Sequence, residues 1–188
     1  MAEKVGVIIA RLQPIHNGHL ELIRQALNEN DKVLVLVGSA DKLNKRNPIP
    51  INMRLEMAEE AIAEAFEAKD VLRTNVQPLD DLTDESDNSH DWGFYLYSTI
   101  VGITGSPTFT IYYSDGFEII MLWFPPFITR NYVSFKLNAR GTIAENISAT
   151  KVRKMIVGMN VEELEKFVPS SVFARREILR QFIMAYGV

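Results

Sequence analysis

Two short runs of consecutive apolar residues constrain the fold more than any other feature of the sequence. Val5 to Ala10 and Lys32 to Val37 carry branched side chains at successive positions instead of alternate ones. A strand with this pattern is buried on both faces, which is typical of a parallel sheet covered by helices on both sides. Between the two runs, Leu20 to Leu27 repeats apolar residues at helical spacing and predicts the crossover that parallel strands require.

The same alternation of strand and helix continues along the chain. A long amphipathic helix is predicted from about Asn52 to Ala68, and a shorter apolar helix from Phe94 to Ile103. The pattern predicts an α/β fold with a doubly wound parallel sheet, whose ligands bind beyond the carboxyl ends of the strands. We expect one domain over residues 1–188, with a C-terminal helical part from about residue 148. The later strands are predicted at Val71 to Gln77, Thr108 to Tyr113 and Tyr132 to Leu137.

Composition excludes several classes of protein. The 188 residues are 47% apolar, which is enough for one core, and no run of eighteen apolar residues predicts a membrane span. The absence of cysteine excludes disulfides and thiolate metal sites. A net charge of −4 argues against a nucleic-acid or membrane partner. We therefore expect a cytoplasmic protein whose metal, if it uses one, arrives with the substrate and is not held by protein side chains.

Two segments depart from regular structure. Asp80 to Asp91 is rich in acidic residues and is predicted to be a solvated loop. Leu122 to Phe127 gathers aromatic residues around two prolines and is predicted to be an apolar loop. The sequence leaves open whether this second loop lines a pocket or a subunit contact.

A cluster of cationic and imidazole side chains follows the first strand. Arg11, His16 and His19 lie within nine residues, and His19 falls in the first turn of the predicted helix. Free backbone N–H groups and the helix dipole favour an anion at such a position. A single histidine is more often a structural residue, but two histidines beside an arginine predict a site for several phosphate oxygens.

A second helix start carries similar groups. Ser148 is a natural N-cap, Thr150 adds a hydroxyl, and Arg153 lies one turn further on. Serine and threonine begin many helices, so this segment alone does not distinguish an ordinary cap from an anion site. We expect it to bind phosphate because the first cluster is present in the same chain.

The first cluster resembles the His-x-Gly-His signature of the nucleotidylyltransferase superfamily, whose fold is Rossmann-like. The run from Arg11 to His19 is most similar to the nicotinamide mononucleotide adenylyltransferases of the archaeal and bifunctional bacterial type. Ala10 and Leu12 stand where those proteins carry glycine and phenylalanine. The second helix start resembles the family's Ile-Ser-x-Thr-x-x-Arg motif. The resemblance implies catalytic roles for His16, His19, Arg11 and Arg153, and an ATP site formed by Ala10, Leu12, His16, His19, Ser148, Thr150 and Arg153.

A third group of residues is expected to hold the second substrate. Gly38-Ser39-Ala40 and Lys45-Arg46-Asn47-Pro48 resemble the family's mononucleotide loop. Without the resemblance, Lys45, Arg46 and Arg54 would be interpreted as surface charges. Trp92 would be interpreted as a residue that fills the hydrophobic core. The resemblance instead implies stacking of Trp92 on the nicotinamide ring, a cation–π contact worth about 0.5–2 kcal/mol. The predicted mononucleotide-binding residues are Ser39, Arg46, Asn47, Arg54 and Trp92.

The resemblance implies that the chain joins the AMP part of ATP to nicotinamide mononucleotide and releases NAD and pyrophosphate. Mg²⁺ would be brought with ATP, and we expect a homo-oligomer. Alternatives are an adenylyltransferase for another phosphorylated acceptor, such as nicotinate mononucleotide or phosphopantetheine, and a non-catalytic adenine-nucleotide sensor. No Nudix-type glutamate box is present, so the hydrolase activity of bifunctional relatives is not expected.

Overall fold

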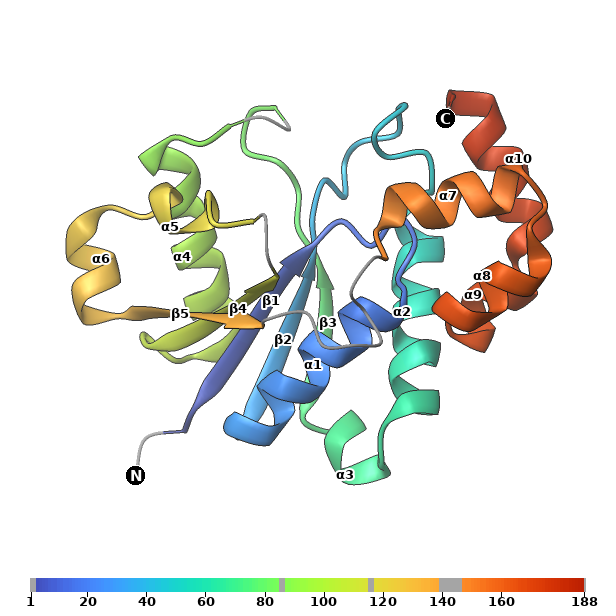
Figure 1. Ribbon diagram of the computed structural model, residues 1–188. Coiled ribbons are helices and arrows are strands. Elements are labelled where there is room, and N and C mark those ends of the chain that lie inside the picture. Colours follow the sequence, from blue (N-terminus) through green and yellow to red (C-terminus); the bar gives the residue numbers. More distant parts are fainter. Residues whose placement is uncertain (1–2, 85–86, 115–116, 139–146, 188) are drawn as a thin grey trace.

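A five-stranded parallel sheet forms the centre of the computed structural model, which describes residues 3–84, 87–114, 117–138 and 147–187 (Figure 1). The strands lie in the order β3-β2-β1-β4-β5, so the chain moves outward from β1 and then returns to its other side. The predicted doubly wound sheet is confirmed, with its switch point between β1 and β4. The strands are β1 (Val5–Ala10), β2 (Lys32–Val37), β3 (Thr74–Pro78), β4 (Phe109–Ser114) and β5 (Val133–Asn138).

The central strands bury both of their faces, as their continuous apolar runs predict. Val33 and Val35 of β2 pack into a core with α1 (Asn17–Glu29) and α2 (Ile51–Ala65). Leu34 and Leu36 point the other way, into a core with α4 (His90–Thr104). Figure 1 shows α1 and α2 on one side of the sheet and α4 on the other. Because successive side chains of a strand point to opposite faces of the sheet, this one apolar strand contributes to both hydrophobic cores.

The end of α2 and the start of β3 differ from the prediction. Phe66 has extended backbone angles, and a separate short helix, α3 (Ala68–Val71), follows it. Arg24 of α1 contacts the chain at this break, since its guanidinium lies 4.8 Å from the centre of the Phe66 ring and donates to the Ala65 carbonyl at 3.4 Å. The strand predicted from Val71 therefore begins at Thr74. β4 and β5 each lie one residue later than predicted.

The helix after the acidic segment begins earlier than predicted. The Ser89 hydroxyl accepts a hydrogen bond from the backbone N–H of Trp92 at 3.2 Å and caps α4, so His90 is already helical. Trp92 thus lies in the first turn of α4, whereas the prediction places it ahead of the helix. The acidic loop ends at Ser89, and its Glu85 lies outside the described residues.

The segment predicted to be an apolar loop contains two short helices. α5 (Ile120–Trp123) and α6 (Pro126–Asn131) are separated by Phe124 and Pro125 alone. The second proline occupies the first position of α6, where its missing N–H costs nothing. Trp123 and Phe124 are buried on the α4 side of the sheet, and Phe127 is 54% exposed. The prolines therefore shape a helical corner.

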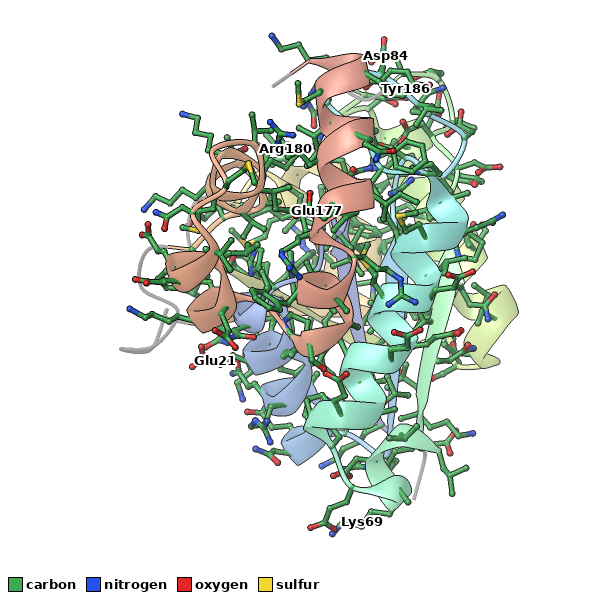
Figure 2. All side chains as sticks on the ribbon, turned by 90° about the vertical axis from the view of Figure 1, so that its right-hand side faces the viewer. Glu21, Lys69, Asp84, Glu177, Arg180 and Tyr186 are labelled. Atoms are coloured by element: carbon green, nitrogen blue, oxygen red, sulfur yellow. The ribbon has the colours of Figure 1, made fainter. Side chains whose placement is uncertain are left out.

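Four helices complete the chain, beginning with the capped start predicted near residue 148. They are α7 (Ala149–Val157), α8 (Val161–Phe167), α9 (Ser170–Ala174) and α10 (Arg176–Tyr186). The Ser171 hydroxyl donates to the Met57 carbonyl at 3.1 Å and attaches α9 to α2. α10 packs against α7 and runs toward the end of the molecule where Asp84 lies, with Tyr186 near its tip (Figure 2). Within the described ranges, no helix is long and apolar enough to cross a membrane.

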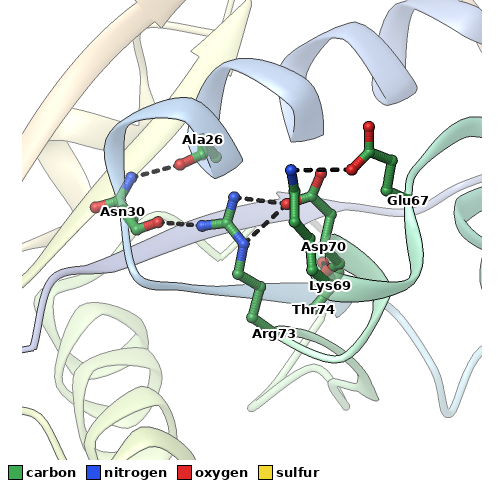
Figure 3. Close-up of polar contacts among 7 residues, drawn as sticks. All are labelled: Ala26, Asn30, Glu67, Lys69, Asp70, Arg73 and Thr74. Carbon is green, nitrogen blue, oxygen red and sulfur yellow. Dashed lines mark hydrogen bonds and ion pairs between the residues drawn. The ribbon is translucent and has the colours of Figure 1, made fainter.

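A cluster of polar side chains joins the end of α1 to α3 and the start of β3. Figure 3 shows Arg73 between α1 and α3. Its guanidinium donates to the Asn30 carbonyl at 2.5 Å and to the Asp70 carboxylate at 2.7 and 3.0 Å. The Asn30 side chain donates to the Ala26 carbonyl at 2.8 Å, in the last turn of α1. These bonds close the helix end with side chains, because its last carbonyls have no helical partner.

Gly93 gives a direct test of the packing between α4 and α5. A Cβ atom at this position would lie 2.0 Å from the Trp123 carbonyl oxygen, whereas one at Gly102 of the same helix would meet nothing within 4 Å. We expect Gly93→Ala to lower the free energy of unfolding by about 1–3 kcal/mol. Gly102→Ala should raise it by about 0.5–1 kcal/mol through helix propensity. Urea denaturation measures both, and equal effects would contradict the described packing.

Candidate functional site

The start of α1 places two imidazoles face to face. His16 is the N-cap residue, and His19 is the third residue of the helix. The ring centroids lie 3.8 Å apart, and the His16 backbone N–H donates to His19 Nδ1 at 3.2 Å. Because Nδ1 accepts this bond, a neutral His19 carries its proton on Nε2. The first turn of α1 therefore presents an imidazole donor that is held in a fixed orientation.

Burial lowers the pKa of His19 well below its ordinary value, and the neighbouring His16 lowers it further. In the absence of ligand, His19 is therefore neutral at pH 7. It acts as a hydrogen-bond donor without a permanent charge, and an anion close to it would restore its affinity for a second proton.

The start of α7 faces the same space. Arg153 donates to the Gln13 carbonyl at 2.9 Å and to the Thr150 hydroxyl at 3.4 Å. Ser148 caps α7 by accepting from the Lys151 N–H at 3.3 Å. Burial, and then the charge of Arg11, lower the pKa of Arg153, so two guanidinium groups lie near each other. An anion bound between the two guanidinium groups would offset their repulsion.

The two helix starts line one pocket of about 340 Å³. This is the juxtaposition that the sequence predicts from its two motifs. Of the predicted ATP-binding residues, Ala10 ends β1 and lines the neighbouring pocket instead. The other six line this pocket, together with Arg11, Glu21 and Phe117. Ser114 and Asn138, the last residues of β4 and β5, complete its wall.

A second pocket of about 580 Å³ adjoins the first. Arg11 and His19 line both pockets, so they mark the junction. Ser39 and Arg46 lie along its β2 side. Its other walls are aromatic and acidic, formed by Trp92, Tyr113, Phe117, Trp123, Asp81, Asp84 and Asp87.

The two tryptophans of the second pocket pack edge to face. The centroids of Trp92 and Trp123 lie 5.9 Å apart at 75°. The Trp123 indole N–H donates to Asn88 Oδ1 at 2.9 Å, which ties this wall to the acidic loop. Trp92 is thus both a core residue and part of the lining, since it is 7% exposed. The sequence offers these two roles as alternatives.

Two of the residues predicted to bind the mononucleotide do not reach either pocket. Arg54 is fully buried and donates to the carbonyls of Arg11 and Gly38, each at 2.8 Å, and of Ser39 at 3.0 Å. Burial first, then the charge of Arg11, lower the pKa of Arg54 to about 10, so it stays cationic at neutral pH. Asn47 is also fully buried and donates to Asn44 Oδ1 at 3.4 Å within its own loop. In the structure both residues therefore lie beneath the pocket lining, and their predicted contacts with the mononucleotide stay predictions.

Gln13 is a supporting residue that the sequence analysis missed. Its buried amide accepts from the Ile49 N–H at 3.0 Å and donates to the Ile49 carbonyl at 3.2 Å. The loop after β1 is therefore joined to the segment before α2. Ser114 and Asn138 were also missed, although each is the polar last residue of a strand in a parallel sheet. A polar residue at the carboxyl end of a parallel strand is a signal for the ligand site, because ligands bind at that edge of the sheet.

Metal binding by protein side chains has no support in the described ranges, where no three His, Asp or Glu side chains come together as a metal site. A divalent ion that enters the pocket together with a phosphate compound would be coordinated by oxygens of that phosphate.

Comparison with known proteins agrees with this geometry. The cytidylyltransferase-like family model matches residues 8–155. A nicotinamide-nucleotide adenylyltransferase of Thermococcus onnurineus is 30% identical over 171 residues, which cover 90% of this chain and 80% of that protein. Another from Thermoplasma acidophilum is 29% identical over 175 residues, covering 90% and 83%.

A solved structure supports the fold alone. The bifunctional NMN adenylyltransferase/ADP ribose pyrophosphatase from Francisella tularensis, complexed with AMP and a Mn ion, superposes with a TM-score of 0.72 at 19% identity. The match covers 98% of this chain and 52% of that one, so this chain spans about half of the bifunctional protein.

The lowered pKa of His19 predicts how stability depends on pH. Below the ordinary value near 6.5, the unfolded chain binds a proton at this residue and the folded chain does not. Stability without ligand should therefore fall as pH decreases from about 6.5, by up to about 1.4 kcal/mol per pH unit from this group. Urea denaturation between pH 7.5 and 5.5 measures the slope. His19→Asn, which keeps an acceptor for the His16 N–H, should show a shallower slope, and His90→Gln is the control. An unchanged slope in His19→Asn would contradict the assignment.

Proposed function

Because the chain belongs to the cytidylyltransferase-like family, we propose that it is an adenylyltransferase that joins the AMP part of ATP to nicotinamide mononucleotide. The products are NAD and pyrophosphate. The chain's resemblance to nicotinamide mononucleotide adenylyltransferases is confirmed by the archaeal relatives, whose names carry this activity.

The shared wall between the two pockets carries the proposal. One pocket offers two helix starts, two arginines and two imidazoles, which is the chemistry of a triphosphate site. The other offers aromatic walls and Arg46, which suits a phosphorylated molecule with a flat cationic ring. His19 and Arg11 line both, so substrates in the two pockets would meet with their phosphates at these side chains.

The reaction needs alignment and charge neutralisation. A phosphate oxygen of the mononucleotide attacks the α-phosphorus of ATP, and the bond from that phosphorus to the bridging oxygen of pyrophosphate breaks. The mononucleotide phosphate is already an anion at neutral pH, so no general base is required. In this scheme His19 donates to the α-phosphate, where charge develops in the transition state. His16, Arg11, Ser148, Thr150 and Arg153 hold the β- and γ-phosphates.

Mg²⁺ would enter as part of the ATP substrate. The pocket has donors for phosphate oxygens, and a divalent metal carried by ATP would bind to the phosphates themselves. The Mn ion named with the Francisella structure supports a divalent metal in that protein. The homo-oligomer and the cytoplasmic location expected from the sequence stay predictions.

The acidic wall of the second pocket favours the amide over the acid mononucleotide. Asp81, Asp84 and Asp87 line it, and hydrogen bonds from Ser89 and Thr83 lower the pKa of Asp87, so that it is ionised at neutral pH. Nicotinate carries one more carboxylate than nicotinamide, and this group would face like charges. Phosphopantetheine has no cationic ring for Trp92, which makes it a weaker candidate. A nucleotide sensor remains the alternative outside catalysis.

Product analysis tests the proposal. ATP, Mg²⁺ and nicotinamide mononucleotide should give NAD and pyrophosphate in equal amounts. His19→Ala should lower kcat by about 10²–10³-fold, as expected when one donor that acts in the transition state is removed. ATP that binds without turnover of any mononucleotide would favour the sensor, and near-normal kcat in His19→Ala would eliminate its assigned role.

Removal of one carboxylate tests the acceptor preference. Asp84→Asn should lower the ratio of kcat/KM for nicotinamide over nicotinate mononucleotide by about two- to fivefold, which corresponds to about 0.5–1 kcal/mol of partly screened repulsion. Glu67→Gln is the matched control, because Glu67 pairs with Lys69 at the opposite end of the molecule (Figures 2 and 3). A ratio that moves equally in both variants, or in neither, would contradict the role of the acidic wall.

A further inference from the structure

Arg54 lies beneath both substrate pockets and lines neither of them. It belongs to the second turn of α2, the helix that follows the mononucleotide loop. We propose that Arg54 is a positioning residue that fixes the separation of the two pockets, and therefore of the two reacting phosphates. This inference rests on the proposed function, because it concerns how the two substrates meet.

One guanidinium joins two loops that belong to different substrates. Nη1 donates to the Arg11 carbonyl in the loop after β1 and to the Gly38 carbonyl after β2, each at 2.8 Å. Nη2 donates to the Ser39 carbonyl at 3.0 Å. The Gly38 N–H also donates to the Ala10 carbonyl at 3.0 Å, between the same two loops. The relative position of the loops is therefore set by a short set of bonds around Arg54.

The two loops are strained where Arg54 holds them. Leu12 and Ser39 each have φ of 49°, in the left-handed region that side chains other than glycine rarely adopt. Leu12 follows the Arg11 carbonyl directly, and Ser39 supplies a bound carbonyl itself. Such conformations persist when surrounding contacts determine them. Arg54 supplies three of those contacts from a fully buried position.

A lysine cannot reproduce this arrangement. The guanidinium is a rigid planar fork that reaches several carbonyls at once, whereas an ammonium is a single compact group on a flexible stem. Arg54→Lys therefore keeps the positive charge under the site and removes most of the geometry. This substitution separates positioning from electrostatics.

Transfer between two bound substrates is sensitive to their separation. Reacting atoms need to lie about 3–3.5 Å apart, and a displacement of about 1 Å costs on the order of 10²-fold in rate. Binding of either substrate alone does not require this alignment, because each pocket keeps its own side chains. Loss of the hydrogen bonds from Arg54 to the two loops should thus lower kcat and leave the affinity for each single substrate nearly unchanged.

A purely structural role for Arg54 makes a different prediction. In that case its substitution would act only through stability, like any other change in the buried face of α2. Ile62 lies about two turns further along the same helix, is 2% exposed and lines neither pocket. Ile62→Ala therefore serves as a destabilised control, matched to Arg54→Lys by melting temperature.

The experiment compares wild type, Arg54→Lys and Ile62→Ala at a temperature where all three are folded by circular dichroism. Calorimetry gives the Kd of an α,β-methylene analogue of ATP and, separately, of nicotinamide mononucleotide. Initial rates give kcat for NAD formation. We expect Arg54→Lys to keep both Kd values within about threefold and to lose about 10²-fold in kcat. Ile62→Ala should keep all three quantities near wild type.

Three outcomes would overturn the positioning role: kcat of folded Arg54→Lys within about threefold of wild type, a loss of kcat that Ile62→Ala reproduces, or a loss confined to the Kd of one ligand. Failure of the proposed function looks different, because wild type itself would then form no NAD.

Discussion

The loop between β1 and α1 is held from three sides, and the pocket formed by the starts of α1 and α7 depends on its position. Arg54 binds the Arg11 carbonyl from below, the Gln13 amide clasps the backbone of Ile49, and Arg153 binds the Gln13 carbonyl from α7. These bonds bring α1, α2 and α7 to one point at the carboxyl edge of the sheet. The loop is therefore a fixed frame for the two helix starts.

The charges around this frame suit a substrate that is strongly negative. Burial, and then the charge of Arg11, lower the pKa of Arg153, and burial keeps His19 neutral at pH 7. Separate binding of a triphosphate and a mononucleotide on either side of Arg11 would relieve this repulsion and bring two anions together at small cost. The acidic wall belongs to the second pocket. The two adjoining pockets thus change in lining from cationic to acidic with distance from the start of α7.

Much of this architecture could be predicted from sequence because it depends on local patterns. β1 and β2 have the predicted bounds, since a strand buried on both faces leaves an uninterrupted apolar run. The break between α2 and α3 has no local signal such as proline, and the contacts made there by Arg24 come from a different helix. Trp123 was assigned to a loop of open role, and only the packing of α5 on α4 brings it beside Trp92.

For the site residues too, local patterns could be predicted from the sequence and contacts between distant segments could not. His16, His19 and Arg153 were predicted because helix starts have local signatures, and the structure brings them together. Arg54 and Asn47 were predicted as ligand contacts, and the structure places both in fully buried positions that line neither pocket. A sequence motif does not show burial, because burial depends on contacts between loops that are distant in the sequence.

In the proposed reaction the two substrates meet at His19, and a crystal structure of the ternary complex tests this arrangement. With the α,β-methylene analogue of ATP and nicotinamide mononucleotide both bound, we predict the α-phosphate within hydrogen-bond distance of His19 Nε2. The mononucleotide phosphate oxygen should lie about 3–3.5 Å from the α-phosphorus. A triphosphate bound away from the starts of α1 and α7, or two ligands whose phosphates do not meet, would contradict the account.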